Sequence, residues 1–287
     1  MSRFYPAFLS VAALLLALPA AGSDLQAPAT VTAGTGFSIP AEGSGEATFY
    51  LVGPAGLSKR KVQLGNAVTV QPEQVQHAGR YTAIVCASTC EAAHFYVTAA
   101  TATRLSLIVH PSRVPVDESN AISAVAFLFD KFHNIVFSPS SVKFTIMPSD
   151  GHQVSTSRPT ADGIGWVRLT SARKEGALKL EASVGDTSEV RVVQQVASEA
   201  CNLRIRAERV KNQLQVETDP VRDCSGNPVP DGTVVTFTKI DSAGKTTVDA
   251  PVKKGIAKVD MPISGEAQIT VASGVVTGNE LRVAAKP

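Results

Sequence analysis

The sequence predicts an all-β chain that folds as three Ig-like β-sandwich domains in tandem after a signal peptide. β-Branched residues are frequent, aromatic residues make up only 6% of the chain, and 21 glycines and 17 prolines interrupt it at short intervals. The sequence lacks long apolar stripes with the period of a helix. Short alternating segments separated by turn residues are typical of β-sandwiches.

An internal repeat predicts the number of domains. The segment from Asp130 to Asn134 has a counterpart from Asp223 to Asn227, and Phe144 has a counterpart in Phe237. Both Asn227 and Phe237 follow their counterparts by 93 residues, and two anchors in one register indicate a duplicated unit. Since domains typically have about 100–150 residues, we expect domains at residues 24–99, 100–197 and 198–287.

The first 23 residues have the features of a secretory signal peptide. Arg3 precedes an apolar run at residues 8–18, and small residues at 19–23 suit cleavage. The run is shorter than the roughly 20 residues of a membrane-spanning helix, and no later segment approaches that length. Because the nearest cysteine is Cys86, we expect no lipid anchor. The mature chain is therefore expected to be exported, to the periplasm or the extracellular space, without a transmembrane segment.

The charges of the mature chain nearly balance. Removing residues 1–23 takes away one arginine, which leaves 26 Lys and Arg against 25 Asp and Glu. Such a chain has no long-range field to attract nucleic acid or an anionic membrane. We expect no nucleic-acid partner.

The four cysteines predict two disulfides, because an exported chain meets an oxidising environment. Four cysteines allow three pairings. Cys86 and Cys90 lie between two alternating runs, which favours a bridge across a hairpin tip. Cys201 and Cys224 lie at the start and just past the end of two strands expected to be antiparallel, which favours a second bridge. A redox or zinc pair at Cys86 and Cys90 is the alternative, but the spacing is not that of Cys-x-x-Cys and no second pair lies nearby.

The first domain has the alternation of a sandwich. Residues 47–52 and 59–64 alternate, and the turn residues Gly53-Pro54-Ala-Gly56 separate them. Further strands are expected at 81–85 and 94–98. Residues Gly79-Arg-Tyr81-Thr-Ala83 resemble the tyrosine corner of immunoglobulin domains, in which the tyrosine hydroxyl bonds the upstream chain. Ala83 takes the place of the usual cysteine, so the inter-sheet disulfide is not expected.

The other two domains follow one scheme. In the second, about seven strands are expected, among them residues 105–109, 121–129, 142–146, 163–169, 177–182 and 190–192. In the third, the counterparts are residues 203–205, 214–216, 235–237, 255–259, 267–271 and 281–283. Trp166 is the only tryptophan. A lone tryptophan in a strand is expected to fill the core.

The repeated loop resembles a known family. Asp223, Gly226, Asn227, Pro228 and Val229, followed by Val235 and Phe237, match the Asp-x-x-Gly-Asn-Pro-Val…Val-x-Phe pattern of bacterial Ig-like domains of the invasin/intimin (Big-1) type. The second domain keeps Asp130 and Asn134 but has His133 and Ile135 where the pattern has Gly and Pro. The resemblance covers domains two and three, and domain one is only generically Ig-like. It implies domains that stack and hold a binding tip away from a cell surface.

Side chains for catalysis or metal binding do not form a recognisable motif. The five histidines show no ligand spacing, and the sequence has no Gly-x-Ser-x-Gly elbow, Walker loop or dinucleotide fingerprint. We expect no enzymatic activity, no cofactor and no metal. Asp130, Asn134, Asp223 and Asn227 are expected to shape their turns by bonding the backbone. A calcium site between domains is the alternative, although a calcium ion takes six or more oxygens.

The expected function is that of an exported, non-catalytic binding, adhesion or scaffold module. Phe132 and Phe137 flank the loop of domain two and are candidate partner contacts, while the competing interpretation places at least one of them inside the sandwich. A protein or a surface glycan is the expected class of partner. One alternative function is a mechanical stalk or accessory subunit without its own ligand, and a further alternative is a secreted hydrolase.

Overall fold

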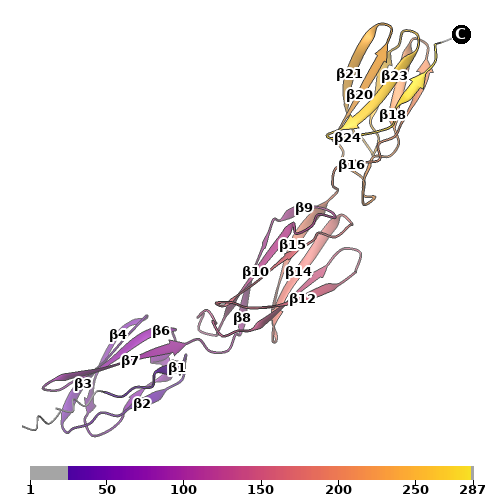
Figure 1. Cartoon of the computed structure of the whole chain (residues 1–287). Coiled ribbons are helices and arrows are strands. Elements are labelled where there is room, and N and C mark those ends of the chain that lie inside the picture. The colour runs from indigo at the N-terminus through magenta and orange to yellow at the C-terminus, as the bar shows by residue number, and fades with distance from the viewer. Residues whose placement is uncertain (1–24, 286–287) are drawn as a thin grey trace, which may run out of the picture. The chain divides into compact units, whose positions relative to one another are not determined.

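A computed structural model of the chain describes residues 25–285 (Figure 1). The predicted signal peptide lies outside the described residues. These residues form strands and one short 3-10 helix at Pro72–Val75. Within this range, no helix is long and apolar enough to cross a bilayer. The chain divides into two compact units, one ending at Thr98 and the other beginning at Ala99.

The first unit contains seven strands among the described residues. They are β1 (Thr30–Thr32), β2 (Phe37–Ile39), β3 (Glu46–Gly53), β4 (Gly56–Gln63), β5 (Val68–Val70), β6 (Gly79–Cys86) and β7 (Cys90–Thr98). One sheet has the order β1-β7-β6-β3-β4, and a second pairs β2 with β5. The two hairpins predicted around residues 53–56 and 86–90 are therefore confirmed.

A tyrosine corner fixes the core of this unit. Tyr81 is buried, donates its hydroxyl hydrogen to the carbonyl oxygen of His77 over 3.0 Å, and stacks on Phe95. A Cβ at Gly53 would overlap the Tyr81 ring, so a side chain does not fit there. The corner predicted from the sequence is confirmed, and Ala83 is fully buried in place of the usual cysteine.

The first half of the second unit, residues 99–197, is a sandwich of two sheets. Its strands are β8 (Arg104–His110), β9 (Arg113–Pro115), β10 (Ile122–Phe129), β11 (Ser141–Met147), β12 (Val154–Pro159), β13 (Ile164–Leu169), β14 (Gly176–Val184) and β15 (Thr187–Val196). One sheet has the order β13-β10-β8 and the other β12-β11-β14-β15-β9. All six predicted segments are strands. The sequence missed β9, which has three residues, and β12, whose residues are almost all exposed.

The second half, residues 198–285, repeats this design. Its strands are β16 (Ala200–Cys201), β17 (Ile205–Val210), β18 (Gln213–Thr218), β19 (Arg222–Asp223), β20 (Val234–Asp241), β21 (Gly244–Pro251), β22 (Lys258–Pro262), β23 (Ala267–Ser273), β24 (Val276–Thr277) and β25 (Leu281–Val283). One sheet has the order β17-β18-β22 and another β21-β20-β23-β24, with β25 also beside β23. A small sheet pairs β16 with β19.

The repeat is visible in backbone detail. Isolated bridges join Ala161 to Ile164 and Lys253 to Ile256, which are 92 residues apart in sequence. The two halves have separate hydrophobic clusters, one around Phe144 and Leu180 and one around Phe237. These clusters support the domain boundary that we propose near Ser198.

Trp166 corrects one prediction. It was expected in the core, but 63% of its surface is exposed. In β13 the neighbours Gly165 and Val167 are buried, and because successive strand residues point to opposite faces, Trp166 points outward.

Candidate functional site

The loop after β10 is organised by the carboxylate of Asp130. Its Oδ1 accepts the backbone N–H groups of Phe132 and Asn134, both over 2.9 Å. Its Oδ2 accepts the Asn134 side-chain amide over 2.8 Å and the backbone N–H of Ala100 over 2.9 Å. One oxygen thus shapes the loop, and the other also holds the segment that leads into β8.

Asp223 repeats this arrangement. Its Oδ1 accepts the backbone N–H groups of Ser225 and Asn227 over 2.9 and 2.8 Å. Its Oδ2 accepts the Asn227 side-chain amide over 3.0 Å and the backbone N–H of Ser198 over 3.1 Å. These bonds confirm that the residues shape their turns. The bond from Ser198 was not predicted, because nearly every residue has a backbone N–H and the sequence does not show which one meets the carboxylate.

Both carboxylates are buried, yet both are stabilised as anions. Burial by itself would raise the pKa of Asp130 and Asp223, since it penalises the charged form. The hydrogen bonds from the Asn134 and Asn227 side chains and from the backbone outweigh burial and lower each pKa below its ordinary value. Both groups are therefore ionised at neutral pH.

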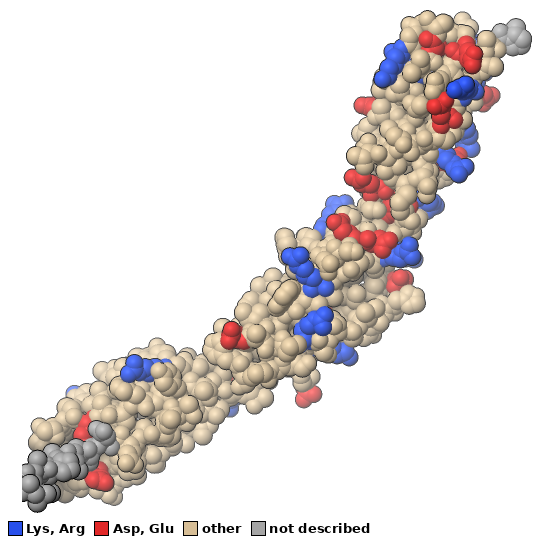
Figure 2. Space-filling model, in the orientation of Figure 1, with Lys and Arg blue, Asp and Glu red and all other residues tan. Residues whose placement is uncertain are grey.

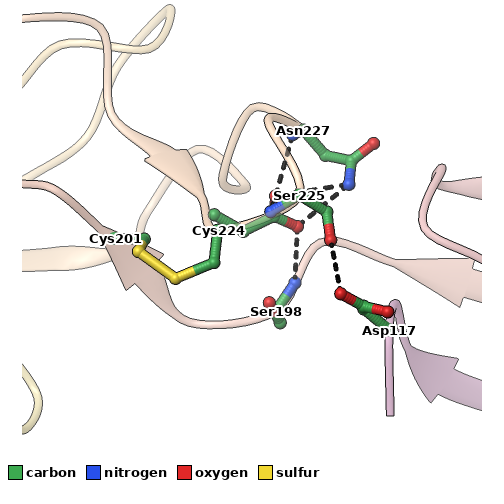
Figure 3. Close-up of a disulfide and its surroundings, with 7 residues drawn as sticks. Asp117, Ser198, Cys201, Cys224, Ser225 and Asn227 are labelled. Atoms are coloured by element: carbon green, nitrogen blue, oxygen red, sulfur yellow. Dashed lines mark hydrogen bonds between the residues drawn. A yellow bond between two sulfur atoms is a disulfide. The ribbon is translucent and has the colours of Figure 1, made fainter.

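Asn227 joins the two halves of the second unit. Its side-chain amide also donates to the carbonyl oxygen of Arg173 over 2.8 Å, and its Oδ1 accepts the backbone N–H of Glu175 over 3.1 Å. Nearby, the Ser225 hydroxyl donates to Asp117 over 3.3 Å (Figure 3). We call the loop of Asp223, Ser225 and Asn227, with its bonds to Asp117, Arg173, Glu175 and Ser198, the linker clamp.

Two disulfides occupy the predicted positions. Cys86 pairs with Cys90 across the tip of the β6–β7 hairpin, with Cα atoms 4.1 Å apart. Cys201 at the end of β16 is bonded to Cys224 just past β19, with Cα atoms 5.0 Å apart. The second disulfide ties the linker clamp to the first strand of its own half (Figure 3).

The remaining residues of the family pattern have structural positions. Val229 and its counterpart Val136 are buried in their clusters, while Pro228 is exposed. Gly226 has φ +89°, and His133 takes the same left-handed conformation at φ +67°. The loop therefore keeps its shape without the glycine.

The two candidate partner contacts differ in burial. Phe132 is half-buried, with the Lys131 ammonium 4.9 Å from the centre of its ring. Phe137 is 63% exposed. Their role as partner contacts remains a prediction.

An apolar sheet surface was missed by the sequence analysis. Trp166 on β13 pairs with Val125 on β10, and Val125 pairs with Ile108 on β8, so the three side chains lie in one row. In the next row, Ile164 and Phe127 pair directly. Cross-strand neighbours on one face have Cβ atoms about 5 Å apart. We call this outward side of β13, β10 and β8 the Trp166 face.

The ends of the Trp166 face are polar and basic. Arg168, Ser123 and His110 form the row beside Trp166, and Arg104 pairs with Phe129 beyond Phe127. No side chain in these cross-strand rows is a carboxylate. Among the described residues, no ion pair involves Arg104, His110 or Arg168.

The corresponding surface of the second half is charged. There Arg206, Glu217 and Lys258 form the cross-strand row on β17, β18 and β22, and Lys258 follows Trp166 by 92 residues. Glu217 pairs with Arg206 over 2.8 Å and with Lys258 over 3.8 Å. A hollow in the structure is lined by these three ion-paired side chains together with Ala207, Glu208 and Gln215. Figure 2 shows Lys and Arg interspersed with Asp and Glu on the visible side of the C-terminal half.

Metal ligands do not gather in the described part of the chain. Residues 25–285 contain no group of three or more His, Cys, Asp or Glu side chains placed to hold a metal ion. The oxygens of Asp130 and Asp223 accept the N–H groups described above.

The fold is that of tandem Ig-like β domains, and it is similar to solved structures of bacterial adhesins. FdeC, an adhesin of Escherichia coli, matches with a TM-score of 0.62 and 17% identity, over 92% of this chain and 96% of that chain. InvD of Yersinia pseudotuberculosis matches with a TM-score of 0.46 and 10% identity, over 92% and 97%. Invasin, a bacterial integrin-binding protein, matches with a TM-score of 0.44 and 11% identity, over 84% of this chain and 53% of that chain. No protein-family model and no curated protein matches the sequence.

Proposed function

We propose that the chain is an exported, non-catalytic adhesion or scaffold module of the cell envelope or the extracellular space. The observation that carries this proposal is the likeness of its fold to the adhesin FdeC over nearly the whole of both chains. The module would comprise Ig-like domains at residues 24–99, 100–197 and 198–287. The loops around Asp130 and Asp223 support a Big-1 type for the last two.

Export is supported by both disulfides. Disulfides persist in secreted and periplasmic proteins and are rare where thiols are kept reduced. Expression of the full chain in a Gram-negative host, followed by fractionation and intact-mass measurement, tests this point. We expect a product that starts near residue 24, is found outside the cytoplasm, and is four hydrogens lighter than the reduced chain. An uncleaved, reduced product in the cytoplasm would contradict export.

Adhesion is tested with the purified mature chain on fluorescent microspheres. The beads are passed under shear over epithelial monolayers, mucin-coated glass and immobilised bacterial cells, with albumin-coated beads as the control. We expect retention above the control on at least one surface. Retention equal to albumin on all three would refute adhesion and favour a role as a stalk.

A stalk is the second candidate function, and the linker clamp favours it. The clamp joins the two halves of the second unit through the bonds of Asn227 to Arg173 and Glu175. A bonded junction between domains transmits force better than a free linker. In a single-molecule force experiment, residues 100–287 are stretched from their two ends. We expect a first force peak, from the opening of the linker clamp, before the peaks of domain unfolding, and this first peak should be absent in Asn227→Ala. An unchanged force record in the variant would remove the support for this role.

A further inference from the structure

We infer that the Trp166 face is a docking surface for a protein whose contacting surface has an apolar centre flanked by Asp and Glu side chains. This inference rests on the proposed binding function and names the surface and the chemistry of the partner. Five apolar side chains form its centre: Ile108, Val125, Phe127, Ile164 and Trp166. Exposed apolar patches rimmed by polar residues on soluble domains mark interaction sites.

The second half of the unit is an internal comparison for this surface. Both halves use the same three-stranded sheet, so the fold does not require an apolar outer side. Where the second half has Arg206, Glu217 and Lys258, the first half has Ile108, Val125 and Trp166. Similarly, Arg222 follows Phe129 by 93 residues. The apolar surface is therefore a property of these residues rather than of the architecture.

Charge complementarity indicates an acidic partner. Arg168 and His110 lie at one end of the face and Arg104 at the other, and the rows between them contain no carboxylate. In the second half, Arg206 and Lys258, which stand at the positions of Ile108 and Trp166, are both paired with Glu217 of the same face. A partner that brings Asp or Glu to both ends would neutralise Arg168 at one end and Arg104 at the other. Tryptophan and arginine are also enriched at protein interfaces.

The same observations disfavour two other occupants. A second copy docked through the same face would use one patch on both subunits. Such a dimer would place Arg104, Arg168 and His110 of each copy against a surface without a carboxylate, so the arginines would remain unpaired. A sugar ring can stack its C–H face on Trp166, but the hydroxyl groups at its edges would then lie above Ile108, Val125 and Ile164 and lose their hydrogen bonds to water without a replacement.

Trp166 is the only tryptophan of the chain, so its fluorescence reports on this surface alone. A phage-displayed library of random 12-residue peptides is selected on the mature chain and counter-selected on Trp166→Ser. We expect enriched peptides that combine aliphatic or aromatic residues with Asp and Glu. Synthetic copies should shift the Trp166 emission to shorter wavelength, with an affinity that falls as salt rises.

Variants separate this surface from a general loss of structure. Ile108→Glu keeps the reporter and should weaken the selected peptides about tenfold or more, since it places a carboxylate at the centre of an apolar contact. Arg168→Gln should weaken them about threefold and reduce the salt dependence. Lys258→Ala, at the equivalent position of the second half, should leave binding unchanged. The substituted side chains are exposed, so each variant should unfold at the same urea concentration as the mature chain. The urea midpoint of each variant checks this.

Four results would overturn the inference. The first is that the selected peptides are predominantly basic, and the second is that they bind Ile108→Glu as tightly as the mature chain. The third is an emission shift with heparin or dextran but not with acidic peptides. The fourth is concentration-dependent self-association that Trp166→Ser abolishes. Failure of the proposed function looks different. If microspheres of Ile108→Glu are retained as well as those of the mature chain, adhesion stands and this surface is not its basis.

Discussion

Asp223→Asn separates the two tasks of the Asp223 carboxylate. The substitution keeps the shape of the side chain but replaces one oxygen with an NH2 group. With the remaining oxygen in the Oδ1 position, the bonds from the N–H groups of Ser225 and Asn227 are retained. The new NH2 group then faces the N–H of Ser198 and the side-chain amide of Asn227, which are both donors. The loop should keep its turn while the linker loses its acceptor.

The expected cost follows from the bonds that are lost. A hydrogen bond to a charged group contributes about 1.5–3 kcal/mol. Two such bonds are lost, but they share one oxygen, so their contributions are not additive. We expect the free energy of unfolding of the second half to fall by about 3 kcal/mol. The amide of Ser198 should exchange its hydrogen about 100-fold faster if it exchanges through opening of this bond.

Urea unfolding and hydrogen-exchange mass spectrometry of the peptide around Ser198 measure these effects. The pKa of Asp223 in the folded chain lies below the ordinary carboxyl pKa of about 4. Its ionisation therefore stabilises the fold fully at pH values above that ordinary pKa. This contribution is lost as pH falls through the folded-state pKa. The difference between the mature chain and the variant should therefore be present at pH 7 and shrink in acid.

The matched control is Asp130→Asn in the other copy of the loop. It should speed exchange at Ala100 and leave Ser198 unchanged, because the equivalent Oδ2 of Asp130 accepts the Ala100 amide. Equal unfolding free energies and equal Ser198 exchange for Asp223→Asn and the mature chain at pH 7 would refute the assigned role of Oδ2. A difference of the same size at pH 7 and pH 2 would refute the role of ionisation.

Three further predictions concern local structure. His133→Gly should raise the free energy of unfolding by about 1 kcal/mol in urea, since glycine adopts φ +67° without strain; a decrease would show that the His133 side chain is needed. Replacing Cys201 and Cys224 by alanine should lower the free energy of unfolding by about 3.5 kcal/mol, and replacing Cys86 and Cys90 should lower it by about 2 kcal/mol, since the first disulfide closes a longer loop. A larger loss of thermal stability for the Cys86–Cys90 variant would count against this. Tyr81→Phe should cost about 1 kcal/mol through its lost bond to His77, and an unchanged midpoint for the first unit would contradict it.

Much of the fold was readable because its signals are local. Alternation along residues 121–129 predicts a strand whatever lies above or below it, and β10 runs from Ile122 to Phe129. The hairpin closed by Cys86 and Cys90 spans few residues, so sequence distance alone brought the cysteines together. The repeat of Asp130 at Asp223 similarly predicted two loops of one shape, which the hydrogen bonds confirm.

The tertiary structure decided which surfaces are covered and which groups meet across the chain. Both sides of β10 carry apolar residues, so the sequence did not reveal that Ala124 and Ala126 face the second sheet while Val125 and Phe127 face outward. For the same reason Trp166 was placed in the core. Whether a strand side is buried depends on what packs against it, and that contact joins distant residues. The N–H groups of Ala100 and Ser198 that meet Asp130 and Asp223 are also common to nearly every residue, so only the folded chain identifies them as partners.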